Sequence, residues 1–214
     1  LKSCMILGLP GAGLALAAYI LTDNLSTAMI ILGITVGMVF VAHPDMRPFI
    51  AVAAAGVILI VIGVLFLVAT TKNSDSFRVM RVLVWLQPEK YSDEGGYQTL
   101  QALYAIGSGG LFGTGLGNSK QKYLYVSEPQ NDFIFSIVCE ELGFVGAAFI
   151  ILLFGLLVWR GVDIAKKCPN RFGSLLVLGI MAQIGFQVVL NIMVVTDTIP
   201  NTGIALPFFS YGGS

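Results

Sequence analysis

The sequence predicts an all-α protein, a polytopic bundle of about five membrane-spanning helices, on three observations. Hydrophobic residues make up 56% of the 214-residue chain and charged residues only 11%, whereas an average soluble domain carries roughly 25% charged residues. Five long stretches contain no Asp, Glu, Lys or Arg or almost none. None of them shows the alternation of polar and apolar residues that membrane-spanning β-strands require. The formal net charge is zero, which gives no indication of nucleic-acid binding.

The five stretches approach the length of about 20 apolar residues that a helix needs to cross a bilayer. They are residues 4–22, 24–42, 48–71, 133–159 and 172–196. The fourth is charge-free from Leu142, and its extension back to Phe133 requires that Glu140 and Glu141 are tolerated inside the span. We expect one transmembrane domain over 1–214. Because the chain starts without methionine and stops in a glycine-rich turn, we expect a fragment of a longer protein.

The charge distribution orients the expected spans. The linker Trp159–Arg171 carries four cations against one acid, and the positive-inside rule places such a short linker in the cytoplasm. Alternation then places a long polar segment, 72–131, and the tail, 197–214, on the extracytoplasmic side.

Two short amphipathic helices are expected within the outer segment. Ser76–Leu86 is apolar with Arg78 and Arg81 three residues apart, hence on one helical face. Tyr97–Ile106 has helical periodicity and is expected to end at Gly107 as its C-cap.

Cysteine and histidine usage indicates no metal site. The three cysteines are an odd number without metal-like spacing and are interpreted as small apolar residues. His43 is the only histidine and falls on the cytoplasmic side, so neither a zinc site nor a histidine-based triad is predicted outside.

Asp132 is the first candidate for chemistry, because it stands where the outer polar segment meets the fourth apolar stretch. A carboxylate at a helix N-terminus is favoured in its ionised form. Two interpretations remain open. Asp132 is either the N-cap of the helix, a position that Asp favours, or a base that acts on a substrate with a polar head and an apolar tail.

Three other acids are weaker candidates. Glu140 and Glu141 lie within a membrane span, where ionisable residues face the bundle interior or a wet cavity; structural pairing with another helix is the alternative. Asp23 sits in a tight outer turn, and turn chemistry alone explains an Asp there.

A glycine run and neighbouring cations form the last candidate group. Six glycines occur in the eleven residues from Gly107 to Gly117, including Gly109, Gly110, Gly113 and Gly115. Such a run allows close backbone approach to a ligand, including a phosphate, or is simply a flexible turn. Lys120 and Lys122 follow it, and with Arg78 and Arg81 they could surround a diphosphate; solvated or lipid-facing cations are the alternative.

Several motifs together resemble the SEDS family (shape, elongation, division and sporulation), whose members include FtsW, RodA and SpoVE. The motifs, in chain order, are Gly96-Tyr97-Gln98, Ala105–Gly113, Gly115-Leu116-Gly117, Gln121-Lys122, Glu128-Pro129, Asp132–Phe135, Glu140–Gly143, Pro200–Ile204, Leu206-Pro207-Phe208 and Ser210–Ser214. The match is densest from about Arg81 onward, and Gln121-Lys122 and Pro200–Ile204 are closer to FtsW and SpoVE than to RodA.

The resemblance implies a fragment of a ten-helix membrane protein that polymerises lipid II into glycan strands at the outer face of the bacterial cytoplasmic membrane. It implies that Asp132 is the essential acid, and we expect Lys120, Lys122, Arg78, Arg81, Gln121, Glu140, Asp23 and Ser210 to contact the substrate. The glycines Gly107, Gly109, Gly110, Gly113 and Gly115 are expected to shape the loop over the site. No cofactor is implied, although a divalent cation could accompany the diphosphate.

The resemblance also implies partners and leaves alternatives. The expected partners are lipid II, the undecaprenyl diphosphate-linked glycan, a class B penicillin-binding protein and other divisome or elongasome proteins. A lipid II flippase and a non-catalytic scaffold for the penicillin-binding protein remain alternatives. The chain departs from many relatives at Gln130-Asn131, at Asp23, and at Asp197, where many relatives have glycine.

Overall fold

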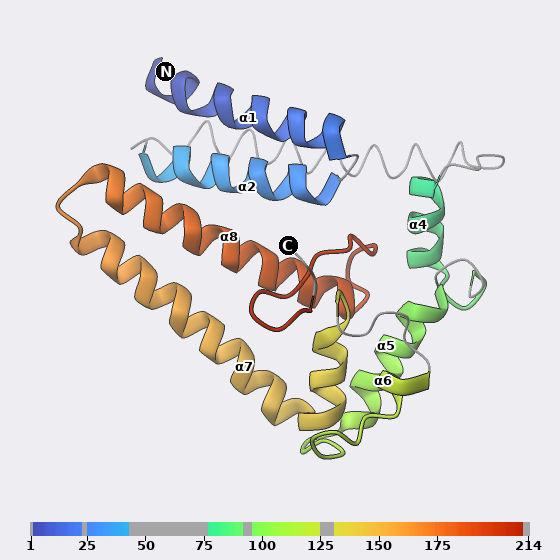
Figure 1. Cartoon of the computed structure of the whole chain (residues 1–214). Coiled ribbons are helices and arrows are strands. Elements are labelled where there is room, and N and C mark those ends of the chain that lie inside the picture. The colour runs from blue at the N-terminus through green and yellow to red at the C-terminus, as the bar shows by residue number, and fades with distance from the viewer. Residues whose placement is uncertain (1, 23–24, 43–76, 92–95, 125–130, 212–214) are drawn as a thin grey trace. The chain divides into compact units, whose positions relative to one another are not determined.

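The computed structural model describes residues 2–22, 25–42, 77–91, 96–124 and 131–211, and within them all regular structure is helical (Figure 1). This agrees with the predicted all-α class. The chain divides into two compact units, Leu1–Met80 and Arg81–Ser214, and each unit is described by itself.

The first unit contains α1 (Lys2–Thr22) and α2 (Leu25–Ala42), which pack against each other. Gly11 lies directly against the Thr35 side chain, so a Cβ at position 11 would overlap it. Thr35 Oγ1 in turn donates to the Ile31 carbonyl at 2.7 Å, which satisfies the hydroxyl within its own helix. The two helices match the expected stretches 4–22 and 24–42, and the expected stretch 48–71 lies outside the described residues.

The second unit contains the two short helices expected in the polar segment. They are α4 (Phe77–Leu86), of which the residues from Arg81 onward belong to this unit, and α5 (Gly96–Gly109), followed by the single turn α6 (Gln121–Leu124). The predicted helix end at Gly107 is wrong, because α5 continues to Gly109. The change of direction occurs at Gly110, whose φ of +55° is accessible to glycine at little cost.

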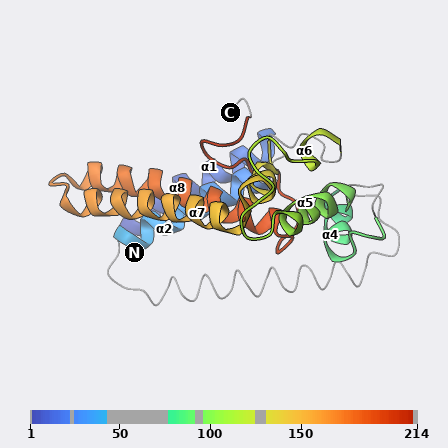
Figure 2. The same cartoon turned by 90° about the horizontal axis from the view of Figure 1, so that it is seen from below.

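Two long apolar helices complete this unit, α7 (Ile134–Lys167) and α8 (Arg171–Val195). They contact each other and spread apart with distance from the turn that joins them (Figure 1), and they follow the same direction in the second view (Figure 2). Both are long and apolar enough to cross a membrane, and Pro10–Leu21 and Thr27–Val41 are shorter apolar helical stretches among the described residues. The expected membrane architecture therefore has two full-length helices here.

The expected linker Trp159–Arg171 is mostly helical, which corrects the sequence interpretation. α7 continues to Lys167, and α8 begins at Arg171 after an Asn170 N-cap that accepts from the Phe172 amide at 3.0 Å. The charges extend the helix rather than interrupt it, because Asp163 pairs with Arg160 at 3.3 Å and Lys167 at 2.8 Å at helical spacing.

The fourth expected stretch, 133–159, is not one uninterrupted helix. Gly143 has φ +68° and ψ −170°, which breaks the helical path inside α7. Figure 1 shows the consequence as a sharp bend between a short first part of α7 and its long second part. α5 packs against α7, and a core that includes Ala102, Phe133, Phe135 and Cys139 joins the two helices.

Candidate functional site

The break in α7 is closed by the glycine-rich loop that follows α5. A helix break leaves carbonyls before it and amides after it without intrahelical partners. The Thr114 and Gly115 amides donate to the Glu140 and Glu141 carbonyls at 2.9 and 3.0 Å. Beyond the break, the Phe144 and Val145 amides donate to the Gly110 and Leu111 carbonyls at 2.9 and 3.1 Å. The loop therefore supplies partners on both sides of the break.

Glycine is required at this junction because backbone packs directly on backbone. A Cβ at Gly109 would overlap the Cys139 carbonyl, one at Gly113 would overlap the Glu141 carbonyl, and one at Gly143 would overlap the Gly113 amide. The predicted loop-shaping role thus has a structural basis at Gly109 and Gly113. A phosphate cradle built from this loop is contradicted for the Gly113, Thr114 and Gly115 amides, since Gly113 N also donates internally, to the Gly109 carbonyl at 2.8 Å.

Glu140 holds the cationic segment that follows the loop. It is buried, with 3% of its surface exposed. One carboxylate oxygen accepts from Ser119 Oγ, and the other accepts from the Lys120 amide at 3.0 Å. Ser119 Oγ accepts from the Lys122 amide at 3.1 Å, which caps the start of α6. Both oxygens of Glu140 are thereby used by the chain itself, so the structure gives Glu140 a positioning role.

The predicted cations differ in what the structure describes of them. Lys120, Lys122 and Arg81 are exposed, as groups that meet a diphosphate must be. Arg78 lies in α4, but its side chain lies outside the described part of the structure, as does Asp23 entirely. The Oε1 atom of Gln121 is buried without a hydrogen-bond partner among the described residues.

Asp132 lies immediately before α7 in a turn, and its side chain is half-buried. The N-cap position of α7 is Phe133, whose side chain makes no capping hydrogen bond. The sequence interpretation of Asp132 as the N-cap is therefore wrong. Asp132 Oδ2 faces Gly203, because a Cβ at Gly203 would lie 3.4 Å from that oxygen. Gly203 has φ +65°, a backbone conformation that favours glycine opposite the acid.

The tail after α8 folds back onto the turn that carries Asp132. Asn191 Nδ2 donates to the Asp132 carbonyl at 2.8 Å and to the Ile204 carbonyl at 2.7 Å. Ser210 Oγ donates to the Asn131 carbonyl at 2.7 Å and accepts from the Leu206 amide at 2.7 Å. Ser210, predicted to contact substrate, thus ties the tail to this turn.

Sequence reasoning missed Asn191, Ser119 and Gly203 as members of the site. A signal for Asn191 was present, because Gln183, Gln187 and Asn191 follow one another at four-residue intervals in an otherwise apolar helix. Polar side chains in a membrane helix commonly mark its functional face. No comparable signal exists for Ser119, whose partner Glu140 is 21 positions away.

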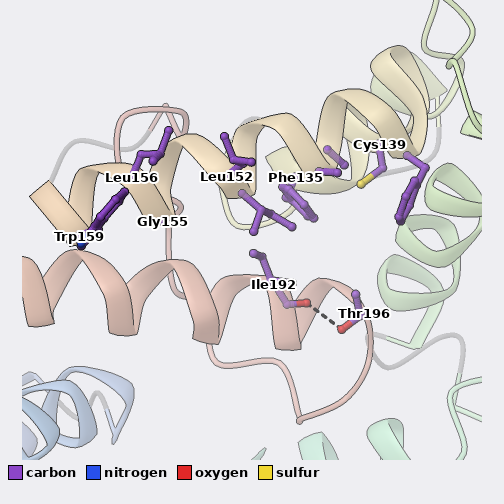
Figure 3. A pocket seen from close by; sticks show the side chains of 12 residues that line it. Phe135, Cys139, Leu152, Gly155, Leu156, Trp159, Ile192 and Thr196 are labelled. Atoms are coloured by element: carbon purple, nitrogen blue, oxygen red, sulfur yellow. Dashed lines mark hydrogen bonds between the residues drawn. The ribbon is translucent and has the colours of Figure 1, made fainter.

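An apolar groove of about 730 Å³ runs between α7 and α8 (Figure 3). Phe135 and Cys139 line it from the first part of α7, Leu156 and Trp159 from the second part, and Thr196 from the C-cap of α8. Thr196 Oγ1 donates to the Ile192 carbonyl at 2.8 Å, so the hydroxyl is satisfied within its own helix. A groove with this lining suits a hydrocarbon chain better than a sugar or a phosphate.

Metal-ligating side chains do not gather in the part of the chain that the structure describes. Within it, no group of three His, Cys, Asp or Glu side chains could hold an ion.

Comparison with known proteins gives a match over nearly the whole chain. A family model described as "Cell cycle protein", for FtsW, RodA and SpoVE, matches residues 2–214. Stage V sporulation protein E of Bacillus subtilis is 43% identical over 208 residues, which are 96% of this chain and 55% of the relative. The probable peptidoglycan glycosyltransferase FtsW of the same organism is 42% identical over 163 residues, 76% of this chain and 40% of the relative.

Solved structures agree with these matches. One similar chain comes from a peptidoglycan synthase complex whose structure is described as showing the coordination of polymerization and crosslinking. Its TM-score is 0.68 and its identity 31%, and the match covers 99% of this chain and 55% of that one. The rod shape determining protein RodA of Thermus thermophilus has a TM-score of 0.56 and 29% identity, covering 100% and 50%. The chain spans about half the length of the curated relatives it matches.

Proposed function

The chain belongs to the cell cycle protein family of FtsW, RodA and SpoVE, and we propose that the protein it comes from is a peptidoglycan glycosyltransferase. Its substrate would be lipid II, which it polymerises into glycan strands at the outer face of the bacterial cytoplasmic membrane. The observation that carries this proposal is the half-buried Asp132 carboxylate, at the start of a membrane-length apolar helix and opposite Gly203.

The substrate's chemistry fits this placement. Lipid II has a prenyl tail that belongs in the bilayer, a diphosphate at the interface and a disaccharide outside. The groove between α7 and α8 is apolar, Lys120, Lys122 and Arg81 are exposed, and the acid stands at the end of the helix. Each part of the lipid thus meets groups of matching polarity.

Asp132 acts in this proposal as the general base. Its carboxylate takes the proton from the acceptor sugar's 4-hydroxyl, and that oxygen bonds to the anomeric carbon of the growing chain. The bond from that carbon to the diphosphate breaks, the diphosphate keeps the electron pair, and the configuration inverts. Lys120, Lys122, Arg78 or Arg81 would neutralise the departing charge.

Glu140 has an indirect part in this mechanism. Its carboxylate anchors Ser119 and the Lys120 amide, so it sets where the cationic segment stands. The glycine loop fixes the same segment from the other side, because Thr114 and Gly115 pair with the carbonyls of Glu140 and Glu141.

We propose a class B penicillin-binding protein as the partner. One structurally similar chain comes from a peptidoglycan synthase complex described as coordinating polymerization and crosslinking. A glycan polymerase needs a transpeptidase to crosslink its product.

The test is to reconstitute the full-length protein in proteoliposomes with labelled lipid II, and to measure polymer and lipid translocation in the same sample. We expect glycan polymer without a requirement for translocation. Translocation without polymer would identify a flippase. Absence of both activities, with polymer appearing only when an active partner polymerase is added, would identify a scaffold.

A further inference from the structure

Asn191 makes an unusual connection in the apolar interior of the second unit. Its side chain has 0% of its surface exposed. Its single amide nitrogen donates to two backbone carbonyls that are far apart in sequence, those of Asp132 and Ile204. Both partners are acceptors only, so the NH₂ group and not the oxygen must face them.

The other half of the same amide is left without a partner. The Oδ1 atom of Asn191 is buried and accepts no hydrogen bond from any described residue. A buried polar atom without a partner destabilises a fold. A side chain retained for packing alone would be apolar here, so the two donated hydrogen bonds explain why an amide occupies this position.

These two hydrogen bonds act on both sides of the proposed catalytic acid. The bond to the Asp132 carbonyl restrains the peptide unit that follows Asp132, and with it the backbone from which the Asp132 side chain extends. The bond to the Ile204 carbonyl fixes the chain next to Gly203, the residue that the Asp132 carboxylate faces. One side chain therefore holds both the turn that carries the acid and the chain opposite it, while Ser210 holds the tail to the same turn through Asn131.

We propose that Asn191 is the positioning residue for Asp132, and that its amide holds the carboxylate in the geometry required for proton transfer. This inference rests on the proposed glycosyltransferase function. It assigns Asn191 no contact with substrate. A displacement of about 1 Å at a catalytic group is sufficient to reduce a rate about 100-fold, so loss of this amide should be visible in turnover.

The experiment is a double-mutant cycle in the full-length protein, with glycan polymerisation from purified lipid II as the measurement. Asn191→Leu keeps the approximate size and removes both donors. Asn191→Ala also removes both donors without adding bulk or charge, and it serves if the leucine variant does not fold. Each is combined with Asp132→Asn, whose residual rate is measured by long incubation. Asn170→Leu is the matched control, because it removes an exposed N-cap from the other end of the same helix.

We expect Asn191→Leu to lower kcat by about 10- to 100-fold with little change in the KM for lipid II, and Asn170→Leu to leave kcat unchanged. In the Asp132→Asn background, Asn191→Leu should cause no further loss, because it acts through the acid that is already removed.

Equal losses in both backgrounds, or a loss matched by the Asn170 control, would show a general structural effect and overturn the inference. An Asn191→Leu enzyme as active as wild type, beside an inactive Asp132→Asn enzyme, would also overturn it and leave the proposed function standing. Wild-type activity in Asp132→Asn would instead overturn the proposed role of Asp132 itself.

Discussion

Replacement of Gly143 by alanine tests the account of the broken helix. Gly143 combines φ +68° with ψ −170°, a region of backbone space that is essentially restricted to glycine. An alanine Cβ would also overlap the Gly113 amide and lie 2.6 Å from the Leu111 carbonyl oxygen. Both neighbours are backbone atoms of the glycine loop, so no side chain can rotate away to make room.

The expected loss of stability follows from these two contributions. Backbone strain of this kind costs about 1–3 kcal/mol. Relief of the overlap requires the loop to move away from α7, which breaks at least two of the four hydrogen bonds across the junction, at about 1 kcal/mol each. The total is roughly 3–5 kcal/mol, which is a large part of the stability of an ordinary domain.

The measurement is thermal unfolding of the full-length protein in detergent, with Gly155→Ala as the control. Gly155 lies in the same helix, and a Cβ there would meet nothing within 4 Å, so alanine should be neutral or slightly stabilising. We expect Gly143→Ala to lower Tm by about 4–6 °C, because the entropy of unfolding of a protein of this length is large. If the two variants unfold at the same temperature, the glycine loop does not support the break in the way described here.

Three further predictions concern the site and its surroundings. Glu140→Gln should weaken the anchor of Ser119 and Lys120 and raise the KM for lipid II several-fold, with a smaller change in kcat; an unchanged KM in a steady-state polymerisation assay would contradict it. Burial raises the pKa of Asp197 above its ordinary value, because the folded chain favours the protonated form of this carboxyl. The resulting stabilisation is fully present below about pH 3.9 and is lost as pH rises through the raised pKa. Asp197→Asn should therefore unfold at a higher temperature than wild type at pH 7, and this difference should shrink toward pH 3. Trp85→Phe removes the 2.9 Å hydrogen bond from the indole to the Asp197 carbonyl and should lower stability by about 1 kcal/mol, measured by the same unfolding assay.

The helical class and the positions of the helices follow from composition and apolar length. The stretches 4–22 and 24–42 and the two short amphipathic helices are found within a few residues of their expected bounds. Hydrophobicity identifies such segments because a backbone in lipid must satisfy its own hydrogen bonds. The family resemblance, carried by the motifs from Gly96 onward, is confirmed by the family match over residues 2–214.

The break at Gly143 could not be found in the same way. Hydrophobicity records the polarity of side chains, and the stretch around Gly143 is apolar on the far side of the break. The break depends on hydrogen bonds from a loop some 30 positions earlier, for example from Thr114 to Glu140. The fixed role of Glu140 was hidden for the same reason, since Ser119 carries no sequence feature that marks it as a partner.

The environment of Asp132 was predicted only in part. Its place at the start of an apolar helix was evident from the sequence, but its separation from the N-cap and its position opposite Gly203 depend on how the tail folds back. That fold depends on Asn191 and Ser210, which contact backbone carbonyls. Every residue has a backbone carbonyl, so the sequence does not indicate which carbonyl a given side chain will contact.

The most direct measurement of the central claim is the rate of lipid II polymerisation by the full-length protein carrying Asp132→Asn, compared with Asp163→Asn. Asp163 is a carboxylate near the other end of α7, and it is already paired with Arg160 and Lys167. We expect Asp132→Asn to lower the rate by about 100- to 10,000-fold, as for loss of a general base, and Asp163→Asn to retain nearly the full rate. Equal rates in the two variants would contradict this claim.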